Sequence, residues 1–289
     1  MRIGTRGSAL ALAQAGSVAE RLGPDSELVT LSTAGDRGST TEDKSRWVAE
    51  LERALIEHEI DVAVHSAKDV PAELAEGLEL VAFPPREDPR DALCGAAALA
   101  ELAPGARVGT SSLRRAAQLK ALREDLEVVS LRGNVDTRLR KLAEGGLDAI
   151  VLAVAGLKRL GLGAHAGAPL DQLVPAAGQG ALAVQARAGE LDAARLEPVN
   201  DRSTAACVEL ERELVRALGA SCHTPVGALA RRLADGQFEL AAWVGLPDGS
   251  EWISDLQRGA QRGLAARVAE RLLTVGAGEL LRRAAAPPR

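Results

Sequence analysis

The chain has 289 residues, of which 46% are hydrophobic and 26% are charged. That length exceeds one typical domain and that composition is too apolar for a disordered chain, so we expect two or three compact domains. The 40 acidic residues outnumber the 35 Lys and Arg residues and give a net charge of −5, which disfavours a surface that coats nucleic acid. Any anion-binding site is therefore expected to be a local cluster.

The cysteines and the apolar segments bear on where the protein works. Cys94, Cys207 and Cys222 are widely spaced and form no Cys-x-x-Cys pair, which argues against a disulfide framework or a zinc site. The apolar stretch near the N-terminus is too short for a secretion signal, and no run of about 18 uncharged apolar residues is present. We therefore expect a cytoplasmic protein with no membrane partner.

The first half of the chain alternates short apolar runs with longer helical patterns, which is typical of α/β units. We expect a parallel-rich sheet with helices on both sides, including a helix over 47–58. A proline-dense stretch at 83–89 and a glycine-rich stretch at 174–180 are candidate crossings between domains. The predicted strands are 2–4, 28–32, 61–65, 78–83, 107–109, 128–130, 149–153 and 181–185.

The pattern changes after about residue 200. A helix is expected over 204–218, followed by a loop that holds Cys222. Two strands joined by Pro247-Asp248-Gly249 and a helix over 260–273 come next. This order predicts a small α+β domain at the C-terminal end.

Three segments share one design, in which a strand leads through a polar turn bearing arginine into a helix. They are residues 3–8, 108–115 and 130–138, and their candidate N-caps are Ser8, Ser111 or Ser112, and Asn134. Helix N-termini and guanidinium groups both favour carboxylate or phosphate. One such segment would be read as a capped surface helix, but three predict a polyanionic ligand held in a cleft at the carboxyl ends of strands.

A fourth segment, 62–71, runs from a buried strand directly into four polar side chains. Amid basic groups, Asp69 is expected to stay ionised and to hold a cation or an acidic N–H, unless it merely pairs with Lys68. His65, Ser66 and Asp69 also resemble a hydrolase triad, although triad partners normally come from separate segments. Cys222, beside His223 in a loop of small residues, is equally consistent with a structural and a reactive thiol, whereas Cys94 and Cys207 have the pattern of packed thiols.

Together these segments resemble the porphobilinogen deaminase family, whose members are also called hydroxymethylbilane synthases. The motifs occur in the family's order from residue 2 to about residue 227, and the remainder is similar to the family's third domain more loosely. The segments that carry the resemblance are 5–8, 65–71, 86–92, 109–115, 131–138, 152–161, 178–180 and 221–222.

The resemblance implies a transferase that polymerises four porphobilinogen molecules, with loss of ammonia, into the linear tetrapyrrole hydroxymethylbilane. It also implies a dipyrromethane cofactor joined by a thioether to Cys222, and no metal. The implied fold is two α/β domains resembling periplasmic binding proteins plus a small α+β domain, with boundaries at 1–85 and 178–199, 86–177, and 200–289. Nothing in the sequence indicates a coiled coil or a dominant hydrophobic patch, so we expect a monomer with a small-molecule substrate and no nucleic-acid partner.

The resemblance also assigns roles to individual residues. Asp69 is implied to stabilise the cation that forms when ammonia leaves, and Arg6 and Arg132 to help that departure. The positions implied to hold the cofactor or substrate carboxylates are Cys222, Ser8, Lys68, Ser112, Arg114, Arg115, Arg132, Arg138 and Gln179. The stretch 38–46 departs from the family's pattern, being shorter and more acidic, and Lys44 is the candidate for the family's loop lysine there.

Two other classes of function remain open. A non-catalytic anion-binding module would use the arginine turns but would tolerate the loss of Cys222 and Asp69. A hydrolase that used His65, Ser66 and Asp69, or Cys222 with His223, would not depend on a covalent pyrrole group.

Overall fold

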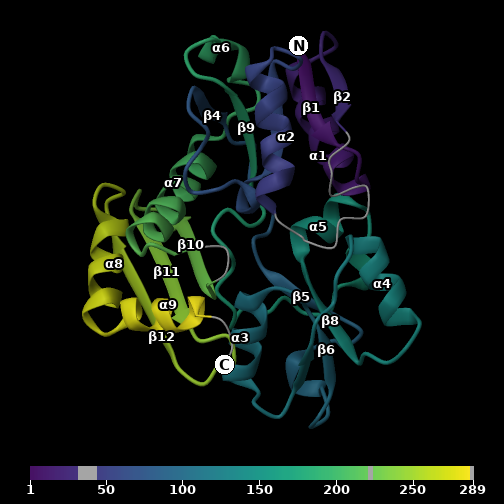
Figure 1. Cartoon of the computed structure of the whole chain (residues 1–289), viewed down its shortest axis with the longest axis vertical. Coiled ribbons are helices and arrows are strands. Elements are labelled where there is room, and N and C mark those ends of the chain that lie inside the picture. The colour runs from purple at the N-terminus through teal and green to yellow at the C-terminus, as the bar shows by residue number, and fades with distance from the viewer. Residues whose placement is uncertain (32–43, 221–223, 287–289) are drawn as a thin grey trace. The chain divides into compact units, whose positions relative to one another are not determined.

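The computed structural model describes residues 1–31, 44–220 and 224–286. By contacts the chain divides into two compact units, which are Met1–Glu87 with Gly178–Ala205, and Asp88–Ala177 with Ala206–Arg289. We call them unit 1 and unit 2, and each is described by itself (Figure 1). The division into three domains expected from the sequence stays a prediction.

Unit 1 is built on a five-stranded sheet with the order β2-β1-β3-β9-β4. β1 runs parallel to β2 and β3, whereas β9 runs antiparallel to β3 and β4. Four of the five described strands of this sheet therefore run in one direction and β9 runs in the other, so the expectation of a parallel-rich sheet is confirmed with β9 as the exception. The reason is that the chain re-enters unit 1 at Gly178, at the edge where β3 ends, so β9 must run back along β3. The strands are β1 Arg2–Arg6, β2 Glu27–Leu31, β3 Val62–Ser66, β4 Leu78–Ala82 and β9 Leu182–Arg187.

Helices cover both faces of this sheet because the side chains of β3 alternate between two apolar cores. Val62 and Val64 belong to the core that includes Val18 of α1 (Ala9–Leu22). Ala63, between them, belongs to the core that includes Leu51 of α2 (Lys44–Ile56). The shorter elements of unit 1 are the 3₁₀ turn η1, Ala67–Asp69, and helix α6, Ala193–Leu196.

Unit 2 contains a four-stranded sheet with the order β5-β8-β6-β7. β6 runs parallel to β7 and β8, and β5 runs antiparallel to β8. Strand β5 was not predicted, because it is short, begins with a carboxylate and directly follows the proline-dense stretch. The elements are β5 Asp91–Cys94, β6 Arg107–Gly109, β7 Glu127–Val129, β8 Ala149–Ala153, α3 Leu113–Leu122, α4 Val135–Ala143 and α5 Val154–Arg159, with 3₁₀ turns η2 Leu99–Glu101 and η3 Gly163–His165.

Unit 2 also contains a three-stranded antiparallel sheet with the order β10-β11-β12, along which α8 and α9 lie (Figure 1). The predicted hairpin is confirmed, since Pro247–Gly249 joins β11 to β12 and Asp248 Oδ1 accepts from the Ser250 N–H at 3.1 Å. Helix α7, Arg202–Ala217, begins in unit 1 and ends in unit 2. The remaining elements are β10 Val226–Arg232, β11 Phe238–Gly245, β12 Trp252–Gly259, α8 Leu264–Thr274 and α9 Ala277–Ala285.

The predicted fold class is confirmed by these elements: two α/β sheets and a smaller α+β portion formed by the C-terminal residues. Among the helices that the structure describes, none is both long enough and apolar enough to span a membrane.

Candidate active site

The polar side chains predicted in unit 1 come together at one edge of its sheet. β1 and β3 are parallel, with Gly4 paired to Ala63, so their carboxyl ends lie at the same edge. Arg6 is the last residue of β1, and the turn that holds Lys68 and Asp69 follows β3 directly. All three side chains are half-buried. The edge thus combines two cations with one carboxylate.

The segment by which the chain returns to unit 1 packs against this edge at Gly178. Gly178 has φ +73°, and a Cβ there would lie 2.9 Å from the carbonyl carbon of Ala67 and 2.9 Å from the Lys68 nitrogen. The Ala67 N–H donates to the Ala181 carbonyl at 3.0 Å. Gln179 is buried in this segment. The Gly178-Gln179 pair is therefore held against the turn that presents Lys68 and Asp69.

The predicted N-caps are partly confirmed. Ser8 Oγ accepts from the Ala11 N–H at 3.3 Å, and Ser112 Oγ accepts from the Arg115 N–H at 3.4 Å. Ser111 is not the cap of α3, and its Oγ lies 3.2 Å from Ser130 Oγ. Asn134 occupies the N-cap position of α4 without a side-chain cap hydrogen bond. A capping hydroxyl accepts with a lone pair, so the hydroxyl protons of Ser8 and Ser112 can still be donated to a ligand oxygen.

His65 and Ser66 point to opposite faces of the unit 1 sheet, because successive strand residues alternate. Ser66 Oγ accepts from Gln14 Nε2 of α1 at 2.9 Å. His65 Nε2 lies 3.0 Å from Gln185 Oε1. Burial lowers the pKa of His65 to about 4. The geometry does not support the hydrolase alternative with His65, Ser66 and Asp69, since His65 is not hydrogen-bonded to Ser66.

In unit 2 a buried carboxylate holds two consecutive arginines. Asp91 begins β5 and pairs with Ala153 at the end of β8, which puts it at the edge where β8 ends. Arg114 Nη2 donates to Asp91 Oδ2 at 2.9 Å, and Arg115 Nη2 donates to Asp91 Oδ1 at 2.7 Å. All three side chains are buried. Sequence reasoning missed Asp91, although a carboxylate at the start of an apolar run was the signal that could have revealed it.

Two guanidinium groups share this one carboxylate, so the buried cluster of Asp91, Arg114 and Arg115 carries a net positive charge. Burial lowers the pKa of Arg114, Asp91 opposes that effect, and the neighbouring Arg115 cation adds to it. Arg114 Nε is buried and has no hydrogen-bond partner among the described residues. In a medium of low dielectric constant an uncompensated positive charge attracts an anion strongly. This edge of unit 2 therefore favours a ligand carboxylate nearby.

The third arginine turn lies between β7 and α4. Arg132 is exposed, and its carbonyl accepts from Lys141 Nζ at 3.2 Å. Arg138 is half-buried and donates from Nε to the Gly133 carbonyl at 2.6 Å. The Nε–H of Arg138 thus stabilises the turn between β7 and α4 that also contains Arg132.

Several predicted residues lie outside the described part of the chain. These are Cys222 with His223, and most of the divergent stretch 38–46; Lys44 is the first residue of α2. The prediction that Cys94 and Cys207 are packed thiols is confirmed, since both are buried. Burial raises the pKa of Cys94 to about 11, which makes it a poor nucleophile at neutral pH.

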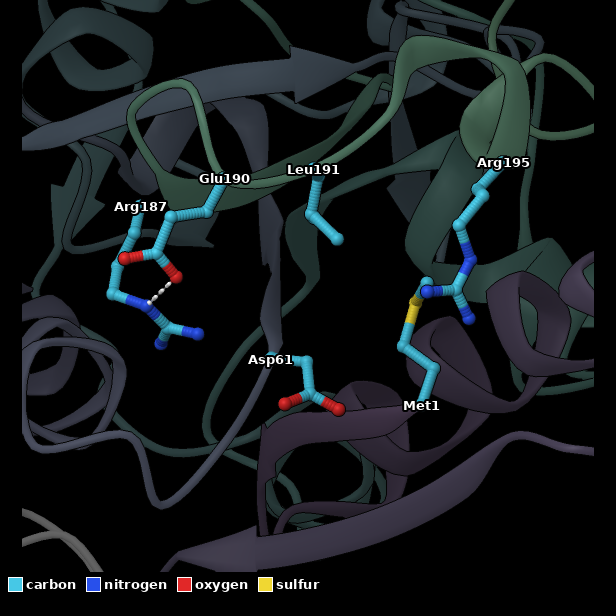
Figure 2. Close-up of a pocket in the computed structure, with 6 residues that line it drawn as sticks. All are labelled: Met1, Asp61, Arg187, Glu190, Leu191 and Arg195. Carbon is cyan, nitrogen blue, oxygen red and sulfur yellow. Dashed lines mark hydrogen bonds and ion pairs between the residues drawn. The ribbon is translucent and has the colours of Figure 1, made fainter.

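The pocket drawn in Figure 2 lies at the other edge of the unit 1 sheet. It has a volume of about 200 Å³ and is lined by Met1, Asp61, Arg187, Glu190, Leu191 and Arg195. Met1 and Asp61 precede β1 and β3, so this edge holds the amino ends of those strands. Arg187 is paired with Glu190 and donates to the Ile60 carbonyl at 3.0 Å. None of the predicted site residues lines this pocket.

No group of three or more His, Cys, Asp and Glu side chains within the described ranges is placed to hold a metal ion. The prediction that the site needs no metal stays a prediction.

Arginine-bearing helix starts at two sheet edges, each with a carboxylate beside them, define an α/β protein whose charged edges suit carboxylate-bearing ligands. The family model described as porphobilinogen deaminase, dipyrromethane cofactor binding domain, matches residues 1–195, and that described as its C-terminal domain matches residues 205–274. The chain therefore belongs to the porphobilinogen deaminase family, as the motifs in the sequence predict.

Curated relatives match nearly the whole chain. The porphobilinogen deaminase of Thiobacillus denitrificans is 46% identical and the alignment covers 97% of both chains. That of Thermus thermophilus is 45% identical, with 96% of this chain and 97% of the relative covered. Among solved structures, a TRAP periplasmic solute-binding protein from Roseobacter denitrificans aligns at 12% identity and a TM-score of 0.41, covering 69% of this chain and 78% of that one.

Proposed function

We propose that each of the two arginine-bearing edges binds pyrrole carboxylates and that Asp69 is the catalytic carboxylate. The protein is a transferase of tetrapyrrole biosynthesis, which joins porphobilinogen molecules with loss of ammonia into hydroxymethylbilane. The observation that carries the assignment of roles is the edge of unit 1, where Arg6, Lys68 and Asp69 follow the ends of two parallel strands.

The residues present suit the dipyrromethane cofactor that the family model names. Each pyrrole ring of such a group carries carboxylate side chains, which need guanidinium, ammonium and hydroxyl donors. The hydroxyls of Ser8 and Ser112 and the net positive cluster around Asp91 are donors and charges of that kind. When bound, the group supplies the electron-rich pyrrole carbon at which the chain grows. We propose the Cys222 thiol as its attachment point.

The roles of the individual residues follow from their charge. When the C–N bond of the substrate's aminomethyl group breaks, its electron pair leaves with nitrogen, and positive charge develops on the substrate's pyrrole ring and its N–H. A fixed carboxylate stabilises that charge without rearranging, so we assign this role to Asp69. We propose Arg6 and Arg132 as helpers of ammonia departure. Lys68, Arg114, Arg115, Arg138 and Gln179 are proposed to hold carboxylates of the cofactor or substrate, with Arg114 and Arg115 acting largely through the net charge of their cluster.

The remaining proposals concern the protein's surroundings and organisation. We propose a cytoplasmic protein without a nucleic-acid partner, supported by the cysteine spacing and the net acidic composition, and a monomer, because the sequence shows no coiled-coil pattern or dominant hydrophobic patch. We also keep the proposal of three domains, supported by the separate sheets formed by β5–β8 and by β10–β12 within unit 2.

Turnover by two matched variants tests the role of Asp69. Asp69→Asn keeps the shape of the side chain and removes its charge, so we expect a folded protein that releases ammonia from porphobilinogen at least about 100-fold more slowly, the loss typical of a missing electrostatic stabiliser. Asp61→Asn removes a carboxylate from the opposite edge of the same sheet and should retain turnover. Near-normal turnover by Asp69→Asn would show that the catalytic charge lies elsewhere.

A further inference from the structure

A buried chain of hydrogen bonds runs behind the Asp69 turn, and nothing in the proposed chemistry uses it. His65 Nε2 lies 3.0 Å from Gln185 Oε1, and Gln185 Nε2 donates to Glu52 Oε1 at 2.9 Å. The three residues come from β3, β9 and α2, and both His65 and Gln185 are buried. Glu52 is half-buried and forms the outer end of the chain.

The chain of bonds determines which ring nitrogen of His65 carries the proton. An ionised carboxylate can only accept hydrogen bonds, so Glu52 requires the NH₂ group of Gln185 to face it. The carbonyl oxygen of Gln185 then faces His65 and can only accept. His65 must therefore donate from Nε2, and in the neutral ring Nδ1 holds the lone pair.

The surroundings of the ring also determine its charge. Burial lowers the pKa of His65 to about 4, with a smaller lowering from Arg6, while the bond to Gln185 and the charge of Asp69 act in the opposite direction. The charged groups that act on the ring are Arg6 at the end of β1 and Asp69 in the turn after β3. Glu52 of α2 contacts the ring only indirectly, through the neutral amide of Gln185. An amide rather than a carboxylate at position 185 keeps the ring from gaining a strong anionic partner.

We propose that Glu52 and Gln185 hold His65 as a neutral Nε2–H imidazole, which makes His65 a positioning residue for the charge of Asp69. An imidazolium at this place would compensate the Asp69 carboxylate, whose task is to stabilise a cation on the substrate. A neutral ring fills the same space and adds no further positive charge beside that carboxylate. The link to catalysis rests on the proposed function, whereas the tautomer and charge of His65 do not.

Nitrogen-15 NMR of histidine ring nitrogens in the purified full-length protein tests the tautomer directly, with the His65→Asn variant used to assign the signal. We expect His65 to show a protonated Nε2 and an unprotonated Nδ1, without titrating between about pH 5.5 and 8. A proton on Nδ1, or titration near the ordinary pKa, would overturn the proposal.

Two variants on one helix test the part of Glu52. Glu52→Gln replaces a carboxylate, which can only accept hydrogen bonds, by an amide, which can also donate them. The Gln185 amide can then flip, and both His65 tautomers should appear. Glu50→Gln removes the same charge two residues earlier, where the carboxylate pairs with Arg53 instead, and should leave the His65 signals unchanged. An unchanged tautomer in Glu52→Gln would refute the orienting role of Glu52.

Gln185→Glu tests the consequence for the reaction. A carboxylate beside Nε2 should raise the pKa of His65 by about one to three pH units, the usual effect of a close opposite charge. Porphobilinogen turnover by this variant should then fall as the pH is lowered through the new pKa of His65, a decline that the wild-type protein lacks. A raised pKa without this decline would refute the link to Asp69. A wild-type protein with the predicted tautomer but without any turnover would instead refute the proposed function and leave the tautomer assignment standing.

Discussion

The substitution Asp91→Asn tests whether one carboxylate holds two arginines of the unit 2 edge. Asp91 is fully buried, and the side chains of Arg114 and Arg115 that it pairs with are only 6% and 7% exposed. Asn has nearly the same shape as Asp and keeps one acceptor oxygen, but it lacks the charge. The substitution therefore leaves two buried guanidinium groups without any anionic partner among the three residues of the cluster.

The expected loss of stability follows from burial. Removing one partner of a buried ion pair costs about 3–5 kcal/mol, because the remaining charge stays out of water without compensation. The pair between Arg90 and Asp171 offers a matched control in the same unit, since its bond is of similar length, 3.0 Å, but the Asp171 side chain is 71% exposed. Exposed pairs contribute at most about 1 kcal/mol, so Asp171→Asn should change stability little.

Urea unfolding of both variants measures the difference. The proteins must be compared in the same state of cofactor loading, checked by mass, because a group bound only to the folded state adds its own stabilisation. We expect Asp91→Asn to lower the free energy of unfolding by about 3 kcal/mol or more relative to Asp171→Asn. Equal stabilities of the two variants would refute the view that Asp91 compensates the buried arginines.

Three further predictions follow from other contacts. Arg115→Met should destabilise the protein more than Arg114→Met in the same urea assay. The reason is that Arg115 donates to Asp91 from both Nε and Nη2, whereas Arg114 donates to it only from Nη2. A larger loss of stability in Arg114→Met would contradict this geometry. Gly178→Ala should cost more than about 1 kcal/mol in thermal or urea unfolding, because φ is +73° and the methyl group would meet Ala67 and Lys68; a neutral effect would mean that the crossing segment adjusts easily. The pKa of His65 is 6.5 in the unfolded chain and about 4 in the folded protein, so between these pH values the unfolded chain binds more protons than the folded protein, and stability should fall as the pH is lowered. His65→Asn should remove that contribution, and an unchanged slope of stability against pH in this variant would contradict the prediction.

Local patterns in the sequence were sufficient for much of the fold. The apolar run before His65 is a buried strand, and the prolines and glycines mark the places where the chain leaves and re-enters unit 1. Ser8 and Ser112 cap their helices because short hydroxyl side chains before an apolar periodic segment favour that position. These features depend on neighbours in sequence, which is why they were predictable.

Features that depend on distant segments were not predictable. The direction of β9 is set by the edge at which the chain returns from unit 2, and no local pattern records it. Asp91 pairs with arginines more than 20 residues later, so its role becomes visible only when β5 lies beside β8. The network of Glu52, Gln185 and His65 likewise joins three elements. The resemblance to a family, rather than local physics, supplied the substrate and the cofactor.

The central claim is that this protein carries a covalent pyrrole group on Cys222 and uses it to polymerise porphobilinogen. Denaturing intact-mass spectrometry before and after incubation with porphobilinogen, followed by peptide mapping, measures this most directly. We expect an adduct of two pyrrole units on the peptide that contains Cys222, lost in Cys222→Ala and retained in Cys207→Ala, whose thiol is buried in an apolar core. A chain that stays bare after incubation, or an adduct that survives in Cys222→Ala, would contradict the claim.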